Sequence, residues 1–331
     1  MKADKRSPRH RRDEKLEDLL AKLNGLLAPL EMRTIRSLAS PRHPIILIFG
    51  VARSGTTLLL QWLAASGRYS YPSNLLSRFY AAPHIGAMIQ QVLTRLDFRG
   101  EVFDFNPERP FQSELGKTRG ALAPHEFWYF WRRFLKPAPG GPRHDADWKL
   151  TNTTALVREL AAIESVFNKP LALKAMIFNW HIPALNARLP RLLCLFIRRQ
   201  PFFNIQSLLE ARQNYFGTLK HWYSFKPPEY KKLRTLDPIG QVAGQVFYTN
   251  RAIERGLEKI PEANRMIIEY EAFCRNPRAI WRALEAKMHG LGFPNRLPYR
   301  GPASFTDTNE VRVSATRAEK IINGYRALTN E

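Results

Sequence analysis

The chain has 331 residues, of which 44% are hydrophobic, so it can bury a substantial core and is too hydrophobic for a disordered protein. Lysine and arginine number 51 against 29 aspartates and glutamates, which leaves a formal charge of +22. This charge attracts nucleotides, nucleic acid, acidic polysaccharide or an anionic membrane surface without choosing among them. No stretch approaches about 18 consecutive apolar residues, so the sequence predicts no membrane-spanning helix.

The two cysteines, Cys194 and Cys274, provide neither a disulfide framework nor a CxxC metal site. The N-terminus is basic and no apolar segment follows it, so a secretory signal is not expected. The simplest interpretation is a protein of the reducing cytoplasm, with association to a membrane surface as an open alternative.

The first 43 residues differ in character from the rest of the chain. Residues 1–12 are basic and polar, which predicts disorder, and residues 13–30 place leucines at helical spacing. We expect this amphipathic helix to pack on the protein, while dimerisation and membrane contact are alternatives. The remainder, residues 44–331, is predicted to form a single α/β domain.

A buried strand and a glycine-flanked loop open that domain. Residues 45–49 read IILIF, a run typical of a strand that is buried on both faces of a parallel sheet. The loop from Gly50 to Gly55 follows, and residues 56–65 are predicted to be helical. Glycine lets the backbone approach a ligand closely, and the free N–H groups at the start of the helix point toward an anion. The pattern therefore indicates a phosphate-binding loop.

Further elements follow in alternation along the chain. Strands are expected at residues 67–71, 171–174, 192–197 and 266–268. Helices are expected at residues 83–96, 124–135, 153–167, 182–189, 201–213 and 277–288, and near the C-terminus. Asn152 or Thr153 is expected to cap the helix at 153–167, and a further long helix is expected to begin at Asp237 and Pro238. This order predicts a three-layer, P-loop-like α/β fold with a central parallel sheet flanked by helices. The long insertions at 98–152 and 214–236 are expected above the carboxyl ends of the strands, where such folds bind ligands.

The loop differs from a Walker A motif at one decisive position. That motif reads G-x-x-x-x-G-K-[ST], whereas here Thr56 stands in place of the lysine and the cation is Arg53, inside the loop. Thr57 occupies the place of the hydroxyl that binds magnesium. The substitution predicts a phosphate-like ligand that needs an arginine and several hydroxyl or N–H donors, with no metal.

The same loop resembles the 5′-phosphosulfate loop of the sulfotransferases that use 3′-phosphoadenosine 5′-phosphosulfate (PAPS). Those enzymes read [KR]-S-G-[TS]-[TS] after a buried strand, and the matching residues here are Arg53, Ser54, Gly55, Thr56 and Thr57. The resemblance implies that these five residues bind the phosphosulfate end of PAPS, with Arg53 also stabilising charge during transfer.

The strand at 192–197 supports the resemblance. An NTPase commonly places an aspartate after such a strand to hold magnesium, but two arginines follow here. Arg199, with Ser207 eight residues later, is similar to the family's 3′-phosphate motif, because both side chains can reach one phosphate. Tyr270 resembles a family tyrosine near the adenine, although a structural tyrosine is an equal interpretation. The resemblance covers residues 44–290, and the missing C-terminal RKG segment points to a divergent, carbohydrate-type or bacterial-type branch.

The resemblance implies transfer of a sulfuryl group from PAPS, without a metal, to a hydroxyl or amine on a glycan, a glycolipid or a small molecule. Lys174 resembles a lysine that assists at the phosphosulfate, or else is a solvated strand-end lysine. Neither of the family's usual positions holds a base, so we consider Glu126 first, because aromatic surroundings suit a carboxylate that accepts a proton. His181, His125 and Glu114 are further candidates, and an ion pair of Glu126 with Arg132 or Arg133 is the structural alternative.

Three other functions stay open at this point. A P-loop nucleotide kinase or NTPase would share the strand and loop but lacks the Walker lysine and the strand-end aspartate. A non-enzymatic binder of anions or nucleic acid would use the net charge, although no specific nucleic-acid motif is present. A degenerate sulfotransferase would bind PAPS without turning it over.

Overall fold

The computed structural model describes residues 5–97, 112–114, 117–138, 141–189, 191–294 and 297–329. At its centre is a four-stranded sheet with the order β6-β1-β7-β8, in which all neighbouring strands are parallel. The strands are β1 (Ile45–Phe49), β6 (Ala172–Lys174), β7 (Leu192–Arg198) and β8 (Arg265–Glu269). The predicted central parallel sheet is thus confirmed.

The strands β1 and β7 form the middle of the sheet. In the register of the sheet, Leu47 lies opposite Leu173 on one side and opposite Cys194 on the other. Every residue of β1 is buried, because helices cover both faces of the sheet. An unbroken run of aliphatic side chains is what such a position requires.

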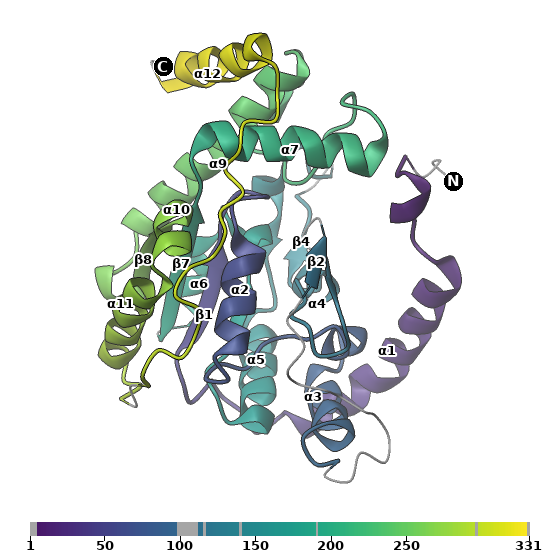
Figure 1. Cartoon of the computed structure of the whole chain (residues 1–331). Helices are drawn as coiled ribbons and strands as arrows, with labels where there is room; N and C mark the ends of the chain where they lie inside the picture. Colours follow the sequence, from purple (N-terminus) through teal and green to yellow (C-terminus); the bar gives the residue numbers. More distant parts are fainter. Residues whose placement is uncertain are drawn as a thin grey trace.

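Helices pack on both faces of the sheet and make three layers (Figure 1). One face packs against α2 (Thr56–Ala65), α10 (Tyr270–Arg275) and α11 (Pro277–Gly290). The opposite face packs against α5 (Thr153–Phe167), α6 (Ile182–Asn186) and the second half of α9 (Pro238–Glu258).

The remaining elements surround this core. The helix α7 (Pro201–Phe216) continues directly from β7 and packs with α9 and the C-terminal helix α12 (Ala315–Thr329) in a separate apolar cluster. The N-terminal helix α1 (Glu14–Thr34) lies along the outside of the molecule, next to α3 (Pro83–Leu93) (Figure 1). The short helices are η1 (Pro8–His10), η2 (Leu76–Phe79), α4 (Trp128–Arg132), η3 (Asp145–Asp147), η4 (Met176–Phe178), α8 (Tyr230–Leu233) and η5 (Glu262–Asn264). The short strands outside the central sheet are β2 (Gln112–Glu114), β3 (Lys117–Arg119), β4 (Leu135–Lys136) and β5 (Lys149–Leu150).

Two predicted elements are wrong. Residues 67–71 do not form a strand, since only Ser70 makes an isolated bridge to Leu171 at the edge of the sheet. The aromatic segment at 124–135 is helical only within α4, because Phe127 has a left-handed backbone with φ of 58°. His125 Nδ1 accepts a hydrogen bond from the Phe127 N–H at 2.9 Å, which holds this turn in place.

Several predicted boundaries also shift. The helix expected at 83–96 ends at Leu93, and the helix expected at 182–189 ends at Asn186. Asn152 precedes α5 in a left-handed conformation, and its side chain does not cap the helix. The Asp237 side chain does cap α9, where it accepts a hydrogen bond from Gly240 N at 2.7 Å as the sequence predicts.

Both cysteines are buried free thiols. Among the described helices, none has the length and apolar character that crossing a bilayer would need.

Candidate active site

The loop between β1 and α2 has an unusual backbone. Arg53 has φ of 70° and Gly55 has φ of 101°, so two residues of this short loop adopt left-handed conformations. A Cβ on Gly55 would lie 2.5 Å from the ring of Tyr270, and one on Gly50 would lie 2.8 Å from the Ile197 carbonyl. Both glycines are therefore needed to fit the loop into the fold.

Hydrogen bonds from neighbouring elements hold the loop in this shape. Asn204 Nδ2 donates to the Ala52 carbonyl at 2.9 Å, and Asn179 Nδ2 donates to the Gly50 carbonyl at 3.0 Å. The Ser54 hydroxyl is fully buried and has no hydrogen-bond partner among the described residues. The fixed loop precedes the first turn of α2, whose N–H groups have no acceptor within the helix.

The hydroxyls of Thr56 and Thr57 diverge from this first turn. Thr56 is buried, and its Oγ1 lies 3.4 Å from Met176 Sδ. Thr57 Oγ1 accepts a hydrogen bond from Lys174 Nζ at 3.0 Å. The structure therefore brings Lys174, from the end of β6, to the loop, as expected from its resemblance to the family lysine.

Lys174 also joins the loop to the aromatic segment. Its Nζ forms an ion pair with Glu126, although 96% of the Lys174 side chain is buried while Glu126 is only partly buried. The second carboxylate oxygen of Glu126 accepts a hydrogen bond from the Trp128 indole. Glu126 thus lies beside the loop, with one oxygen on the lysine and one on the indole.

The alternative pairing of Glu126 with Arg132 or Arg133 is not found. Arg133 instead makes a bidentate pair with the buried Glu159, with N–O distances of 2.6 and 2.7 Å. Burial raises the pKa of Glu159, and the adjacent guanidinium opposes that rise. Most of the other rings of this segment pack inward, so the aromatic block is largely core.

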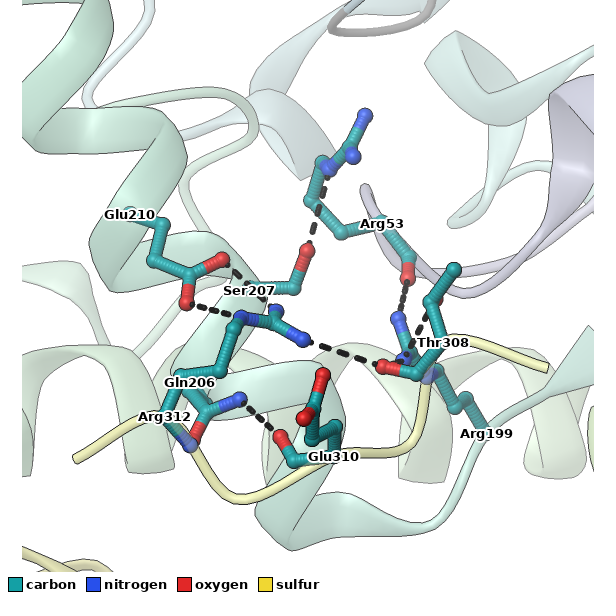
Figure 2. Close-up of polar contacts among 8 residues, drawn as sticks. All are labelled: Arg53, Arg199, Gln206, Ser207, Glu210, Thr308, Glu310 and Arg312. Carbon is teal, nitrogen blue, oxygen red and sulfur yellow. Dashed lines mark hydrogen bonds and ion pairs between the residues drawn. The ribbon is translucent and has the colours of Figure 1, made fainter.

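The second predicted anchor meets the loop at the carboxyl end of the sheet (Figure 2). Arg53 Nε donates a hydrogen bond to Ser207 Oγ at 3.2 Å, and Arg199 donates from Nη1 to the Arg53 carbonyl at 3.3 Å. Arg53, Arg199 and Ser207 therefore lie together, although up to 154 residues separate them in sequence.

The guanidinium of Arg199 has an environment that favours an anion. Its side chain is buried and makes no ion pair with a described carboxylate, because all of its hydrogen-bond acceptors are neutral. Burial lowers the pKa of Arg199 from its ordinary value. Its charge lies 4.9 Å from the centre of the Tyr270 ring, which fits between Arg199 and Gly55. Glu271, which accepts a hydrogen bond from Asn309, is the nearby carboxylate that opposes this fall in pKa, but it does not contact Arg199 directly. A buried cation with no direct carboxylate partner favours an anionic ligand.

Sequence reasoning did not identify the residues that supply most of these acceptors. Arg199 donates to the side chain of Asn309 at 2.7 Å and to the Thr308 carbonyl and hydroxyl at 2.9 and 3.0 Å. Arg312, a few residues later, forms a bidentate pair with Glu210 of α7, with both N–O distances 2.9 Å. This segment between α11 and α12 crosses the site (Figure 2). Its mixed polar sequence contains no local pattern that would have revealed the contact.

The other base candidates lie elsewhere or have other partners. Burial lowers the pKa of His125 to about 4, and its Nδ1 is engaged by a backbone N–H. His181 contacts the Trp148 carbonyl and the Phe178 ring, and burial lowers its pKa. Glu114 lies in β2, and its side chain is outside the described part of the chain.

A family model described as "Sulfotransferase family" matches residues 44–293, which is well over half of the chain. The chain belongs to the sulfotransferase family. The reaction of this sulfotransferase is accordingly transfer of a sulfuryl group, and the kinase or NTPase alternative is not favoured. The segment that supplies Thr308, Asn309 and Arg312 lies outside the matched range.

A solved structure of a bacterial sulfotransferase shares the fold. Sulfotransferase STF9 from Mycobacterium avium superposes with a TM-score of 0.55 at 15% identity, covering 99% of this chain and 87% of its own. Sulfotransferase STF1 from Mycobacterium tuberculosis H37Rv gives a TM-score of 0.48 at 14% identity, covering 80% of this chain and 72% of its own. A search of curated proteins finds no match. In the described part of the sulfotransferase, no group of His, Cys, Asp and Glu could hold a metal ion.

Proposed function

We propose that this sulfotransferase uses PAPS as its donor and that Arg53, Arg199 and Ser207 hold the two anionic ends of that nucleotide. The observation that supports the proposal is the meeting of two distant arginines in one place, where Arg199 has only neutral partners. An adenosine bisphosphate carries negative charge at both its 3′ and 5′ positions. It would therefore supply a directly bonded anion, which neither guanidinium has among the described residues.

At the 5′ end, the loop would bind the phosphosulfate. The backbone N–H groups of Gly55, Thr56 and Thr57 lie at the start of α2, where the helix dipole favours negative charge. Ser54 would contribute its hydroxyl, which has no partner among the described residues. Arg53 and Lys174 would add cationic donors to the oxygen that becomes negative as the sulfur leaves it. At the other end, Arg199 and Ser207 would bind the 3′-phosphate, and we propose no direct role for Tyr270 beyond orienting Arg199.

Transfer requires a base for the acceptor proton, and Glu126 is our candidate. An acceptor oxygen forms a bond to sulfur, the bond from sulfur to the 5′-phosphate oxygen breaks, and 3′,5′-ADP leaves. The acceptor proton passes to the Glu126 carboxylate, which Lys174 and Trp128 hold beside the loop. Positioning and charge stabilisation then provide most of the rate enhancement, as in phosphoryl transfer.

We propose that the acceptor is a hydroxyl, or an amine, on a glycan, a glycolipid or a small molecule. The positive charge of the protein suits an acidic glycan or an anionic headgroup as well as the nucleotide itself. The proposed place of action is the cytoplasm. A panel of such acceptors with labelled PAPS would identify the class.

Two consecutive arginines offer a matched test of the nucleotide site. Arg199→Ala should weaken 3′,5′-ADP binding about 10- to 100-fold, because it removes charge-assisted hydrogen bonds to a phosphate. Arg198→Ala should leave the affinity unchanged, since Arg198 pairs with Glu254 and Glu269. Isothermal titration calorimetry measures the affinity of each variant for 3′,5′-ADP. Equal losses in the two variants, or greater thermal stabilisation of the protein by ATP with magnesium than by 3′,5′-ADP, would contradict the proposal.

A further inference from the structure

The N-terminal helix α1 is fixed to the protein by one side. Asn24 is buried, its Nδ2 donates to the Arg78 carbonyl at 2.8 Å, and its Oδ1 accepts from the Ala81 N–H at 2.7 Å. The buried Glu31 accepts hydrogen bonds from the N–H groups of His84 and Ile85, at 2.7 and 3.1 Å. These contacts fix the rotation of α1 about its own axis, so the direction in which its other faces point is determined.

A second side of α1 presents leucines to solvent. The five residues are spaced by three and four positions, which places them in one stripe along the helix: Leu16, Leu19, Leu23, Leu26 and Leu30. Leu19 is 63% exposed and Leu26 is 79% exposed. We name this set the leucine stripe. The adjoining α3 exposes Met88 and Val92 as well.

Charged residues are arranged around the leucine stripe by sign. At about 3.6 residues per turn, Lys15, Lys22 and Arg33 fall on the flank of the stripe, and all three are exposed. The acidic residues Glu14 and Asp18 fall on the side that points away from it. Basic residues thus border the apolar surface, and acidic ones are kept from it.

The segment that precedes α1 adds further positive charge. Exposed basic side chains there are Lys5, Arg9, Arg11 and Arg12. The segment is held on α7 by a hydrogen bond from Ser7 N to the Tyr215 carbonyl at 2.9 Å, and by stacking of His10 on the Tyr215 ring.

The sign of this charge distinguishes between possible partners of the leucine stripe. A second copy of the chain would bring the same lysines toward the stripe's basic flank, and each copy has a formal charge of +22. Anionic lipid headgroups would instead neutralise these side chains while the leucines enter the acyl boundary. We propose that α1 binds the sulfotransferase to the surface of an anionic membrane, with the leucine stripe facing the lipid. The inference does not depend on PAPS as donor.

Vesicle co-sedimentation of the full chain tests the proposal. The wild type should bind vesicles of phosphatidylserine and phosphatidylcholine, and should bind pure phosphatidylcholine far more weakly. Leu19→Ser combined with Leu26→Ser should lower binding at least about tenfold, because two apolar side chains no longer insert. The control combines Leu236→Ser with Leu297→Ser, two leucines that are exposed outside α1, and should bind like the wild type.

A charge variant provides an independent measurement. Lys15→Glu combined with Lys22→Glu should reduce binding to the anionic vesicles and flatten its dependence on salt. Wild-type protein that does not bind these vesicles would overturn the proposal, as would unchanged binding by the leucine variant. If analytical ultracentrifugation shows that the leucine variant turns a dimer into a monomer, the stripe is covered by a second copy and the proposal is wrong.

Discussion

Arg198 and Arg199 show how one position in a strand decides the electrostatic environment of a side chain. Arg198 is partly exposed and pairs with Glu254 at 2.9 Å and with Glu269 at 2.6 Å. Arg199, the next residue, turns into the protein and finds only amide, hydroxyl and carbonyl oxygens. Exposed pairs of the Arg198 kind contribute little to stability. The buried guanidinium is the one whose charge remains available for a ligand.

The proposed role of Glu126 as the base can be tested by a substitution that preserves the shape of its side chain. Glu126→Gln preserves the size of the side chain and removes its ability to accept the acceptor proton. We expect turnover of labelled PAPS to fall about 10²- to 10⁴-fold, the usual contribution of a general base. The affinity for 3′,5′-ADP should stay the same, and the exposed Glu258→Gln serves as the control. Full turnover by the Gln variant would remove Glu126 from consideration.

Some side chains of the candidate site were recognisable in the sequence and others were not. Arg199 stands directly after an apolar strand, and Arg53 stands in the loop that follows another. The carboxyl ends of parallel strands meet at one edge of a sheet. Glu126 was recognised as a candidate base because aromatic residues surround it in the sequence. Thr308 and Asn309 come from an irregular polar segment, and no local pattern records which distant guanidinium such a segment will contact. Tertiary packing alone brings them to Arg199.

At the scale of elements, the loop after β1 depends on Gly55. Gly55→Ala should lower the free energy of unfolding by at least about 2 kcal/mol, because a left-handed alanine is strained and its Cβ would collide with Tyr270. Gly67→Ala is a matched control, since Gly67 is also left-handed but its Cβ would meet nothing within 4 Å. Urea denaturation measures both. Equal losses would show that the Tyr270 contact is unimportant.

Elements whose burial is uniform were predictable, and those that depend on single backbone angles were not. The strands β1 and β7 have unbroken aliphatic runs, so their place in the middle of the sheet followed from composition. The N-terminus of α9 followed from Asp237, a side chain that caps locally. The start of α4 was missed because Phe127 adopts a left-handed conformation that is rare for a bulky residue.

For the molecule as a whole, the C-terminal helix stabilises the region around the loop. Ile321 of α12 is fully buried in a cluster that also contains Val51 of the loop and Ile205 of α7. Ile321→Ala should lower the free energy of unfolding by about 2–4 kcal/mol through the cavity it leaves. The next residue provides the control, since Ile322 is 39% exposed and its replacement by alanine should cost under about 1 kcal/mol. Chemical denaturation that shows equal effects would contradict this role for α12.

Most of the oxygens that hold Arg199 come from residues that follow the last strand of the central sheet in sequence. A ribosome has finished all four strands of the central sheet when it reaches Glu269, yet Thr308 and Asn309 follow much later. A nascent chain can therefore build its sheet while the guanidinium still lacks these acceptors. Competence to bind a nucleotide would then arise only after the segment between α11 and α12 has been synthesised and has packed against Arg199.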